Sequence, residues 1–289
     1  MTPESPLNQK QAVGYLVLAA LLWSTGGVLI KPISLNPPAV AGLRSAISFL
    51  CLGYLCRKVP FQWSGTLFGA SIAYASTVFF FVLGIKWTTV ANTCLLQYTA
   101  PIYVALFSHW FLGEPTQKQD WITIGVVFFG ILLFFLDRLS FNGILGNCCA
   151  LISGVSLAWV TLLLRKQKNT SSLPSLVLGN LLCTVVCLPF MFEAMPTSRD
   201  WIFLSLLGTF QLGLSYYFYG QALKYVRAIE GILIPIIAPI LNPMWAWIFL
   251  DEIPGFWSFC GGSVVFVTVT FRSMMLLKTQ KKSNTENSL

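Results

Sequence analysis

Thirteen polar and aromatic side chains lie inside long apolar stretches of this sequence, where buried hydrogen-bonding groups are costly. Amides and phenols can bind a solute without a net charge, and aromatic rings offer flat apolar walls. The nine of them in the middle helices, from Tyr74 to Tyr219, suit as a set a cavity for a zwitterionic or heterocyclic solute, although any one member can instead bridge two helices. The thirteen residues are Trp23, Ser24, Thr25, Arg44, Tyr74, Asn92, Gln97, Tyr98, Asn180, Gln211, Ser215, Tyr216 and Tyr219.

Arg44 is the one basic residue that lies well within an apolar stretch. An unpaired guanidinium at membrane depth costs at least ~2.5 kcal/mol. Its side chain can clamp a carboxylate or phosphate of a solute through two parallel hydrogen bonds. It can equally extend to the membrane interface or pair with a backbone carbonyl. The sequence leaves both alternatives open.

Two sequence features indicate where helices can change shape. Trp23, Ser24 and Thr25 are followed by Gly26 and Gly27, so the chain there can loosen and expose backbone groups to a ligand, or simply pack closely against a neighbouring helix. Prolines inside apolar stretches remove a backbone hydrogen bond and can kink a helix. Such kinks can act as gates, or they can merely give the helix a bent shape. These prolines are Pro101, Pro235, Pro239 and Pro243.

Other reactive residue types do not form a recognisable catalytic or metal-binding set. The eight cysteines lie in apolar segments without Cys-x-x-Cys spacing, and the single histidine is His109, so we interpret the cysteines as packing residues. All ten acidic residues fall in tails, loops or helix ends, and there is no Gly-x-x-x-x-Gly-Lys motif for ATP. We expect no cofactor and no metal. Facilitated or weakly coupled movement of a solute is the default hypothesis, with Glu114 and Glu252 as caps or loop salt bridges.

Composition predicts an integral membrane protein. Only 10% of the 289 residues are charged and 56% are apolar, with a mean hydropathy of +0.73. Soluble domains carry roughly 25% charged residues, so this surface suits lipid rather than water. The net charge of +8 does not indicate nucleic-acid binding, because the basic residues lie between apolar runs.

Apolar runs bounded by charges, Pro or Gly predict an all-α fold of ten membrane-spanning helices. Their expected ranges are Gln11–Ile30, Pro38–Cys56, Gly65–Ile85, Thr88–Leu112, Trp121–Leu136, Asn142–Leu164, Ser175–Phe192, Trp201–Ala222, Ala228–Leu250 and Phe256–Leu277.

The distribution of Lys and Arg predicts the orientation of these helices. With both chain ends in the cytoplasm, 13 basic residues fall on the cytoplasmic side and 4 on the other, with Arg44 inside a helix. The positive-inside rule favours this arrangement. The four on the outer side are Lys31, Lys86, Arg138 and Arg199.

An internal repeat divides the chain into two halves, residues 11–136 and 142–277. Lys86 matches Lys224, Pro101 matches Pro239 and Glu114 matches Glu252, and each pair is separated by the same 138 positions. Five helices per half is an odd number, so the halves enter the membrane in opposite orientations. Inverted repeats of this kind are typical of secondary transporters.

The repeated segments resemble the EamA domain of the drug/metabolite transporter superfamily. The resemblance rests on Lys86 through Pro101 to Leu-Gly-Glu114, and on the second copy from Leu214-Ser-Tyr-Tyr-Phe-Tyr-Gly-Gln through Pro239 to Leu-Asp-Glu252. Arg44-Ser-Ala-Ile and Ser156-Leu-Ala-Trp also fit. The resemblance implies transport of small solutes such as amino acids, purine-type metabolites, S-adenosylmethionine or riboflavin. Ala238 departs from the family pattern, because relatives often carry Glu there.

We therefore predict a secondary transporter that moves a small metabolite (an amino acid, nucleoside-like or vitamin-like solute) across the cytoplasmic membrane by alternating access. Its expected partners are the solute and membrane lipid, without nucleic acid, and the sequence carries no signal for the oligomeric state. A membrane-embedded enzyme and a receptor or scaffold without transport are the alternatives. The enzyme is disfavoured by one histidine and no carboxylate pair within a span.

Overall fold

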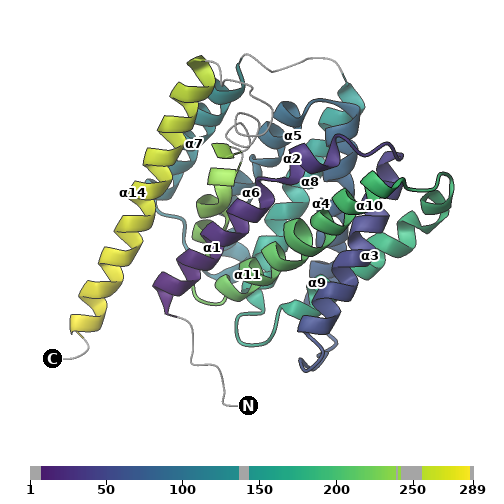
Figure 1. The fold of residues 1–289 in the computed structure, drawn as a ribbon. Helices are drawn as coiled ribbons and strands as arrows, with labels where there is room; N and C mark the ends of the chain where they lie inside the picture. Colours follow the sequence, from purple (N-terminus) through teal and green to yellow (C-terminus); the bar gives the residue numbers. More distant parts are fainter. Residues whose placement is uncertain (1–7, 137–142, 239, 242–255, 287–289) are drawn as a thin grey trace.

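The computed structural model describes residues 8–136, 143–238, 240–241 and 256–286, and all of its regular structure is helical (Figure 1). In the first part of the chain the helices are α1 (Gln9–Trp23), α2 (Gly26–Ile30), α3 (Pro37–Leu55), α4 (Gly65–Trp87), α5 (Val90–Gln97), α6 (Ala100–Leu112) and α7 (Lys118–Phe135). In the second part they are α8 (Ile144–Lys166), α9 (Leu173–Cys187), η2 (Leu188–Phe192), α10 (Ser198–Leu206), η3 (Leu207–Leu214), α11 (Ser215–Ala222), α12 (Ala228–Leu233), η4 (Ile234–Ile237) and α14 (Phe256–Glu286).

The outside of this bundle is apolar, as expected of a membrane protein. Leu50 and Val186 are 69% and 63% exposed, and many other large apolar side chains on the helices are exposed as well. Such a surface is stable in lipid and would aggregate in water. Six helical segments of the described residues are long and apolar enough to cross a membrane. They are Gln9–Ile30, Pro37–Leu55, Gly65–Trp87, Ile144–Lys166, Leu173–Phe192 and Ser198–Ala222. The predicted all-α membrane class is confirmed.

Polar side chains just before the helices explain where several of them begin. Asn8, Asn36, Ser64, Thr89 and Thr197 each accept a hydrogen bond from a backbone N–H in the first turn of the following helix. These bonds satisfy donors that no helical partner can reach, which matters where water is scarce.

Several helices are interrupted near the middle of the bundle. Ser24 and Thr25 separate α1 from α2, and their hydroxyls donate to the carbonyls of Leu21 (2.6 Å) and Leu22 (2.8 Å). Thr99 separates α5 from α6 in the same way, just before Pro101. Hydroxyls that bond back to the preceding turn bend a helix. The loosening anticipated at Ser24 and Thr25 is therefore observed.

Two further irregular turns follow in the second part of the chain. Residues 207–214 form η3, a π-helical stretch with a wider turn, and η4 is a 3-10 turn that contains Pro235. π-Helical turns are rare and often occur at functional sites. Proline has no N–H to continue an α-helix, which accounts for the tighter turn at η4.

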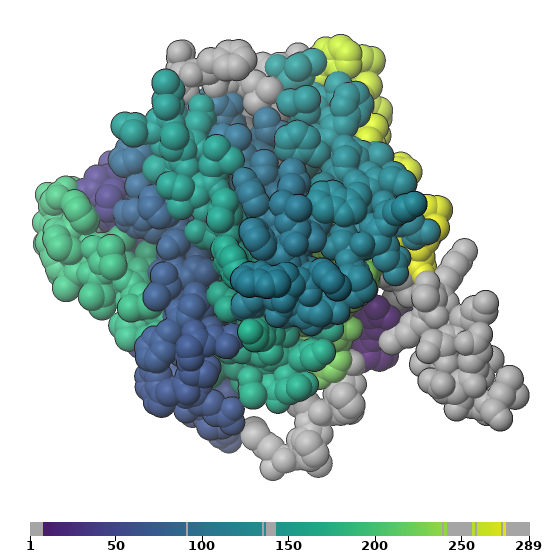
Figure 2. Space-filling view, turned by 180° about the vertical axis from the view of Figure 1, so that it is seen from behind, coloured from purple at the N-terminus to yellow at the C-terminus, as the bar shows by residue number. Residues whose placement is uncertain are grey.

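Helices from distant parts of the sequence pack side by side. Close pairs are α4 with α8, α3 with α9, α1 with α11, and α7 with α14. In Figure 1, α7 and α14 stand at one side of the bundle, and Figure 2 shows α14 in yellow along one edge. α1 begins and α14 ends at the same end of the bundle (Figure 1).

Among the described residues, the outer bounds of the first eight expected helices agree with the observed ones to within a few residues, although four of these helices are divided into two or three elements. The clearest difference is α14, which continues to Glu286 rather than ending near Leu277. Residues 278–286 are polar but contain neither Pro nor Gly, so nothing in the sequence breaks the helix. The end of the ninth expected helix, with Pro239, Pro243 and Glu252, lies outside the described residues.

Close packing at Gly208 gives a direct test of the bundle. A Cβ atom at this position would lie 2.6 Å from the Cβ of Ile47 and 2.7 Å from the backbone oxygen of Arg44. Because a backbone oxygen cannot move aside, Gly208→Ala should destabilise the protein by about 1–3 kcal/mol, measured as a lower melting temperature in detergent. Gly53→Ala is the control, since no atom lies within 4 Å of its Cβ. Equal melting temperatures for the two variants would contradict the packing described.

Candidate functional site

A cavity of about 50 Å³ lies where the interrupted helices meet. It has room for roughly three to five water molecules, at about 10–15 Å³ each. The described residues that line it are Trp23, Gly27, Arg44, Thr77, Val78, Phe81, Cys94, Gln97, Tyr98, Leu157, Gln211, Leu212, Tyr216, Ile232, Pro235 and Ala238. These residues come from α1 through α5 and from α8, η3, α11, α12 and η4, with Tyr98 just after α5 and Ala238 just after η4. The cavity therefore lies between distant parts of the chain.

Arg44 is the charged group of this cavity. Its side chain is only 1% exposed, and its terminal nitrogens donate to the carbonyl of Val78 (2.9 Å) and to the side chain of Gln211 (3.3 Å). Gln211 lies in the π-helical turn of η3. Of the alternatives left open by the sequence, pairing with a backbone carbonyl is observed and extension to the surface is not.

Aromatic rings close one side of the cavity. Trp23 packs against Tyr216 and Tyr219, with ring centroids 4.9 and 5.0 Å apart, and Tyr74 meets Tyr216 edge-on at 4.6 Å. Tyr74 and Tyr219 are fully buried. Tyr74 precedes the cavity residues of α4, and Tyr219 follows the cavity residue of α11. Both tyrosines therefore lie nearer than the cavity residues to the end of the bundle where α1 begins and α14 ends. The four rings, here named the aromatic cluster, therefore separate the cavity from that end of the bundle.

The structure brings six of the thirteen predicted site residues together around the cavity and places the other seven nearby in contacts between or within helices. Those on the cavity wall are Trp23, Arg44, Gln97, Tyr98, Gln211 and Tyr216. Those outside the wall are Ser24, Thr25, Tyr74, Asn92, Asn180, Ser215 and Tyr219.

Most of these seven polar groups are satisfied by protein partners. Asn180 donates to the hydroxyl of Tyr74 (3.0 Å), and the hydroxyl of Tyr219 shares a hydrogen bond with Thr161 (2.7 Å). Asn92 donates to Asn147 (3.1 Å), which joins α5 to α8. These contacts hold the helices that carry the cavity wall.

The remaining three of the seven bond within their own helical segments. Ser24 and Thr25 bond back to the preceding turn, and the hydroxyl of Ser215 donates to the carbonyls of Gln211 and Leu212. Their hydroxyls therefore serve backbone groups at two of the helix interruptions.

Thr77 is a cavity residue that the sequence prediction omitted. Its carbonyl accepts a hydrogen bond from Ser153 (3.0 Å), whose hydroxyl also accepts from Gln97 (2.8 Å). The internal repeat carried a usable signal, because Thr77 lies 138 positions before Ser215.

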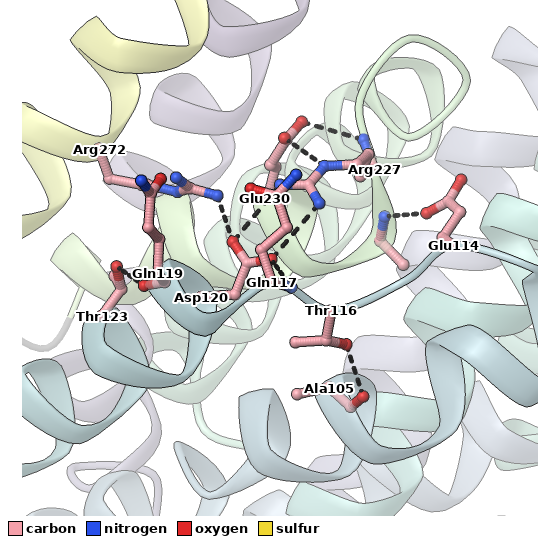
Figure 3. A network of polar contacts seen from close by, with 11 residues as sticks. Ala105, Glu114, Thr116, Gln117, Gln119, Asp120, Thr123, Arg227, Glu230 and Arg272 are labelled. Carbon is pink, nitrogen blue, oxygen red and sulfur yellow. Dashed lines mark hydrogen bonds and ion pairs between the residues drawn. The ribbon is translucent and has the colours of Figure 1, made fainter.

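A network of ion pairs lies at the end of the bundle that holds the chain termini (Figure 3). The carboxylate of Asp120, at the start of α7, is fully buried and pairs with both Arg227 (3.4 Å) and Arg272. Arg227 also pairs with Glu230 at 2.7 Å. The network thus joins α7, the start of α12 and α14.

Glu114 forms a second connection at the same end. It pairs with Arg165 at the end of α8 (2.7 Å) and accepts a hydrogen bond from the backbone N–H of Ala228 (2.9 Å). Arg165 also donates to the carbonyls of Leu223 and Lys224. The expected role of Glu114 in a loop salt bridge is confirmed.

Neighbouring carboxylates hold Arg227 in its charged form. Partial burial lowers the pKa of its guanidinium, but the adjacent Glu230 and Asp120 more than offset this effect, so the pKa lies above its ordinary value. The sequence placed Asp120 at a helix end without anticipating that it is buried among basic residues. Its partners are 107 and 152 positions away, a distance over which no local pattern gives a signal.

The sequence model of the EamA-like transporter family matches this chain twice, over residues 10–136 and 144–274. The chain belongs to the EamA-like transporter family. The family resemblance noted in the sequence is thereby confirmed. With six helical segments of the described residues long and apolar enough to cross a membrane, the chain is a multi-pass membrane protein.

Named relatives cover nearly the whole chain. An uncharacterized transporter of Archaeoglobus fulgidus is 24% identical over 257 residues, which span 88% of this chain and 93% of the relative. The pseudopaline exporter CntI of Pseudomonas aeruginosa is 27% identical over 272 residues, spanning 89% and 94%. A solved crystal structure superposes with a TM-score of 0.78 at 16% identity, covering 93% of this chain and 99% of the other, and shows a shared fold.

Asp120→Asn tests the ion-pair network. Loss of the carboxylate leaves Arg272 buried without its anionic partner, while Arg227 keeps Glu230 and is partly exposed. Breaking a buried pair costs about 3–5 kcal/mol, and we expect the lower end of that range because solvent screens Arg227. The measurement is the melting temperature of the purified protein, which should fall by roughly 5 °C or more.

A double-mutant cycle with Arg272→Gln separates this ion pair from general damage. The two substitutions should couple by at least about 1 kcal/mol, because both remove the same contact. Glu193→Gln, at an exposed carboxylate, is the matched control and should change stability by less than about 0.5 kcal/mol. Additive effects of Asp120→Asn and Arg272→Gln would show that the pair does not stabilise the fold.

Proposed function

We propose that this protein is a secondary transporter that carries a small metabolite through the central cavity by alternating access. The observation that carries the proposal is a cavity between interrupted helices with a buried arginine, Arg44, on its wall. Transporters bind solutes near the middle of the membrane with such discontinuous helices. The predicted site residues on the cavity wall are assigned to solute binding.

Ten membrane-spanning helices in two inverted halves are part of this proposal. The packing supports this arrangement, because contacts between the two halves have counterparts. When each helix is replaced by the equivalent helix of the other half, the resulting pair of helices is also in contact. The contact of α4 with α8 corresponds to that of α11 with α1, and α4 with α9 corresponds to η3 with α3. The two family matches and the constant spacing of 138 residues support the same division, at 11–136 and 142–277.

The end of the bundle that holds the chain termini is assigned to the cytoplasm. The excess of Lys and Arg in the loops at this end supports the assignment. In this conformation the aromatic cluster lies between the cavity and that end. The ion-pair network holds α7, α12 and α14 together at the same end. Solute exchange with the cytoplasm would therefore require the aromatic cluster to separate.

The cargo is assigned to the small metabolites, as expected from the sequence: an amino acid, nucleoside-like or vitamin-like solute. The name of the pseudopaline exporter supports a small metabolite as the cargo. The cavity of about 50 Å³ accommodates a small part of such a molecule, so binding must be accompanied by movement of the surrounding helices. Movement of this kind is expected of a carrier.

A thermal-shift screen followed by flux measurements tests this function. Purified protein is heated with amino acids, nucleosides, vitamins and S-adenosylmethionine, because a ligand that binds the folded state raises its melting temperature. Stabilising compounds are then tested for uptake into proteoliposomes. We expect uptake of at least one of them, and expect no strong response to an imposed pH gradient.

Tyr216→Ala provides the matched variant. Tyr216 lines the cavity and contacts Trp23 and Tyr74, so removing its ring should reduce flux by about tenfold while folded protein remains in the membrane. Tyr225→Ala, in the loop after α11, lies outside the cavity wall and should leave flux unchanged. Normal flux in Tyr216→Ala would contradict the assigned route.

A further inference from the structure

Arg44 presents unused hydrogen-bond donors to the central cavity. A guanidinium has five N–H donors, and one hydrogen bond each from its two terminal nitrogens is accounted for by Val78 and Gln211. Within the described part of the chain, its Nε has no hydrogen-bond partner. The side chain is almost completely buried, so bulk water does not supply the missing acceptor. Leaving such a charged donor unpaired is costly.

A second unpaired donor belongs to the same cavity wall. The indole nitrogen of Trp23 is buried and also lacks a partner among the described residues. An indole N–H can only donate. Trp23 comes from α1 and Arg44 from α3, so two separate helices leave donors unused in one small space. Neither donor is paired with an acceptor of the described cavity wall.

The positive charge of Arg44 also lacks a partner on the described cavity wall. The described residues that line the cavity include no Asp or Glu, and the described ion pairs lie near the chain termini, at Glu114, Asp120 and Glu230. A buried guanidinium without a counter-charge is strongly disfavoured. A bound anion would supply both the missing acceptors and the missing negative charge.

We propose, building on the transport function above, that the solute is an organic monoanion whose carboxylate binds Arg44. The carboxylate accepts hydrogen bonds from the guanidinium of Arg44 and from the indole of Trp23. The apolar part of the solute packs against the aromatic rings of Tyr98 and Tyr216. Two oxygens with several lone pairs match the planar donors of an arginine.

The balance of charge favours a monocarboxylate over other anions. One guanidinium and one carboxylate sum to zero, whereas a phosphate monoester carries about −1.5 to −2 charges near neutral pH. A zwitterionic amino acid has no net charge, so the cavity would keep one positive charge when it binds. On the described wall, aromatic rings are the groups that would compensate that charge. A carboxylate without an ammonium group is therefore the assigned class.

Four related probes test this class on the purified full-length protein in detergent. They are phenylacetate, neutral phenylacetamide, zwitterionic phenylalanine and phenyl phosphate, which share one ring and differ in charge. Thermal-shift titrations give the apparent affinity of each. We expect phenylacetate to bind most tightly, at least about tenfold more tightly than phenylacetamide, because hydrogen bonds to a charged group are stronger than neutral ones.

Variants of the two donors connect this preference to the cavity. Arg44→Gln should abolish the preference for phenylacetate over phenylacetamide, and Trp23→Phe should reduce it while keeping an aromatic ring. Arg44→Lys retains the charge but loses the planar donors, so it should weaken phenylacetate binding even if Arg44→Gln does not fold. Arg57→Gln, at an exposed arginine just after α3, is the matched control and should bind like the unaltered protein.

The competing results are distinct. If phenylalanine, phenylacetamide or phenyl phosphate binds more tightly than phenylacetate, or if no probe binds, the assigned class is wrong. Unchanged phenylacetate binding in Arg44→Lys and Trp23→Phe would also overturn the proposal. Flux of phenylacetate into proteoliposomes is measured separately. Binding that depends on Arg44 without any flux would contradict transport but leave the anion site standing.

Discussion

A positive charge buried among apolar helices needs hydrogen-bond acceptors, which the interior of a membrane protein rarely provides. For Arg44, acceptors come from two other elements of the bundle, α4 and η3. The backbone carbonyl of Val78 lies within the continuous helix α4 and accepts a hydrogen bond from Arg44. It can do so because a carbonyl oxygen has two lone pairs. The second acceptor, Gln211, comes from a π-helical turn. Together they tie α3 to α4 and η3 around one small cavity. The buried charge therefore lies on the cavity wall and links three of the elements that form it.

The helix interruptions and the polar contacts behind the cavity solve a related problem. A solute site needs exposed polar groups, whereas the membrane interior penalises them. Here Ser24, Thr25 and Thr99 donate to backbone carbonyls at two interruptions. Asn180 and Thr161 bond to two phenols of the aromatic cluster, those of Tyr74 and Tyr219. Among the described residues of the cavity wall, the buried donors left without a partner are the indole nitrogen of Trp23 and Nε of Arg44.

The sequence was sufficient to predict what depends on local pattern. Apolar length predicted the helices, and Ser24 and Thr25 before two glycines indicated the interruption after α1. The cavity residues Trp23, Arg44, Gln97, Tyr98, Gln211 and Tyr216 were found because polar groups at membrane depth are rare. Asn92 and Asn180 drew attention for the same reason, but a single sequence does not distinguish a cavity wall from a helix contact. The pairing of Asp120 with Arg272 joins residues 152 positions apart, and only the packing of α7 against α14 brings them together.

Accessibility of Cys94 from the two sides of the membrane tests the central claim most directly. Cys94 lines the cavity and is 5% exposed, so it reports on access to the place where Arg44 lies. In a variant that keeps Cys94 as its one thiol, an anionic methanethiosulfonate reagent that does not cross the membrane is applied to vesicles of each orientation. Alternating access predicts labelling from either side, slowed by a bound solute. Labelling from one side only under all conditions, or from neither side, would contradict a transport route through this cavity.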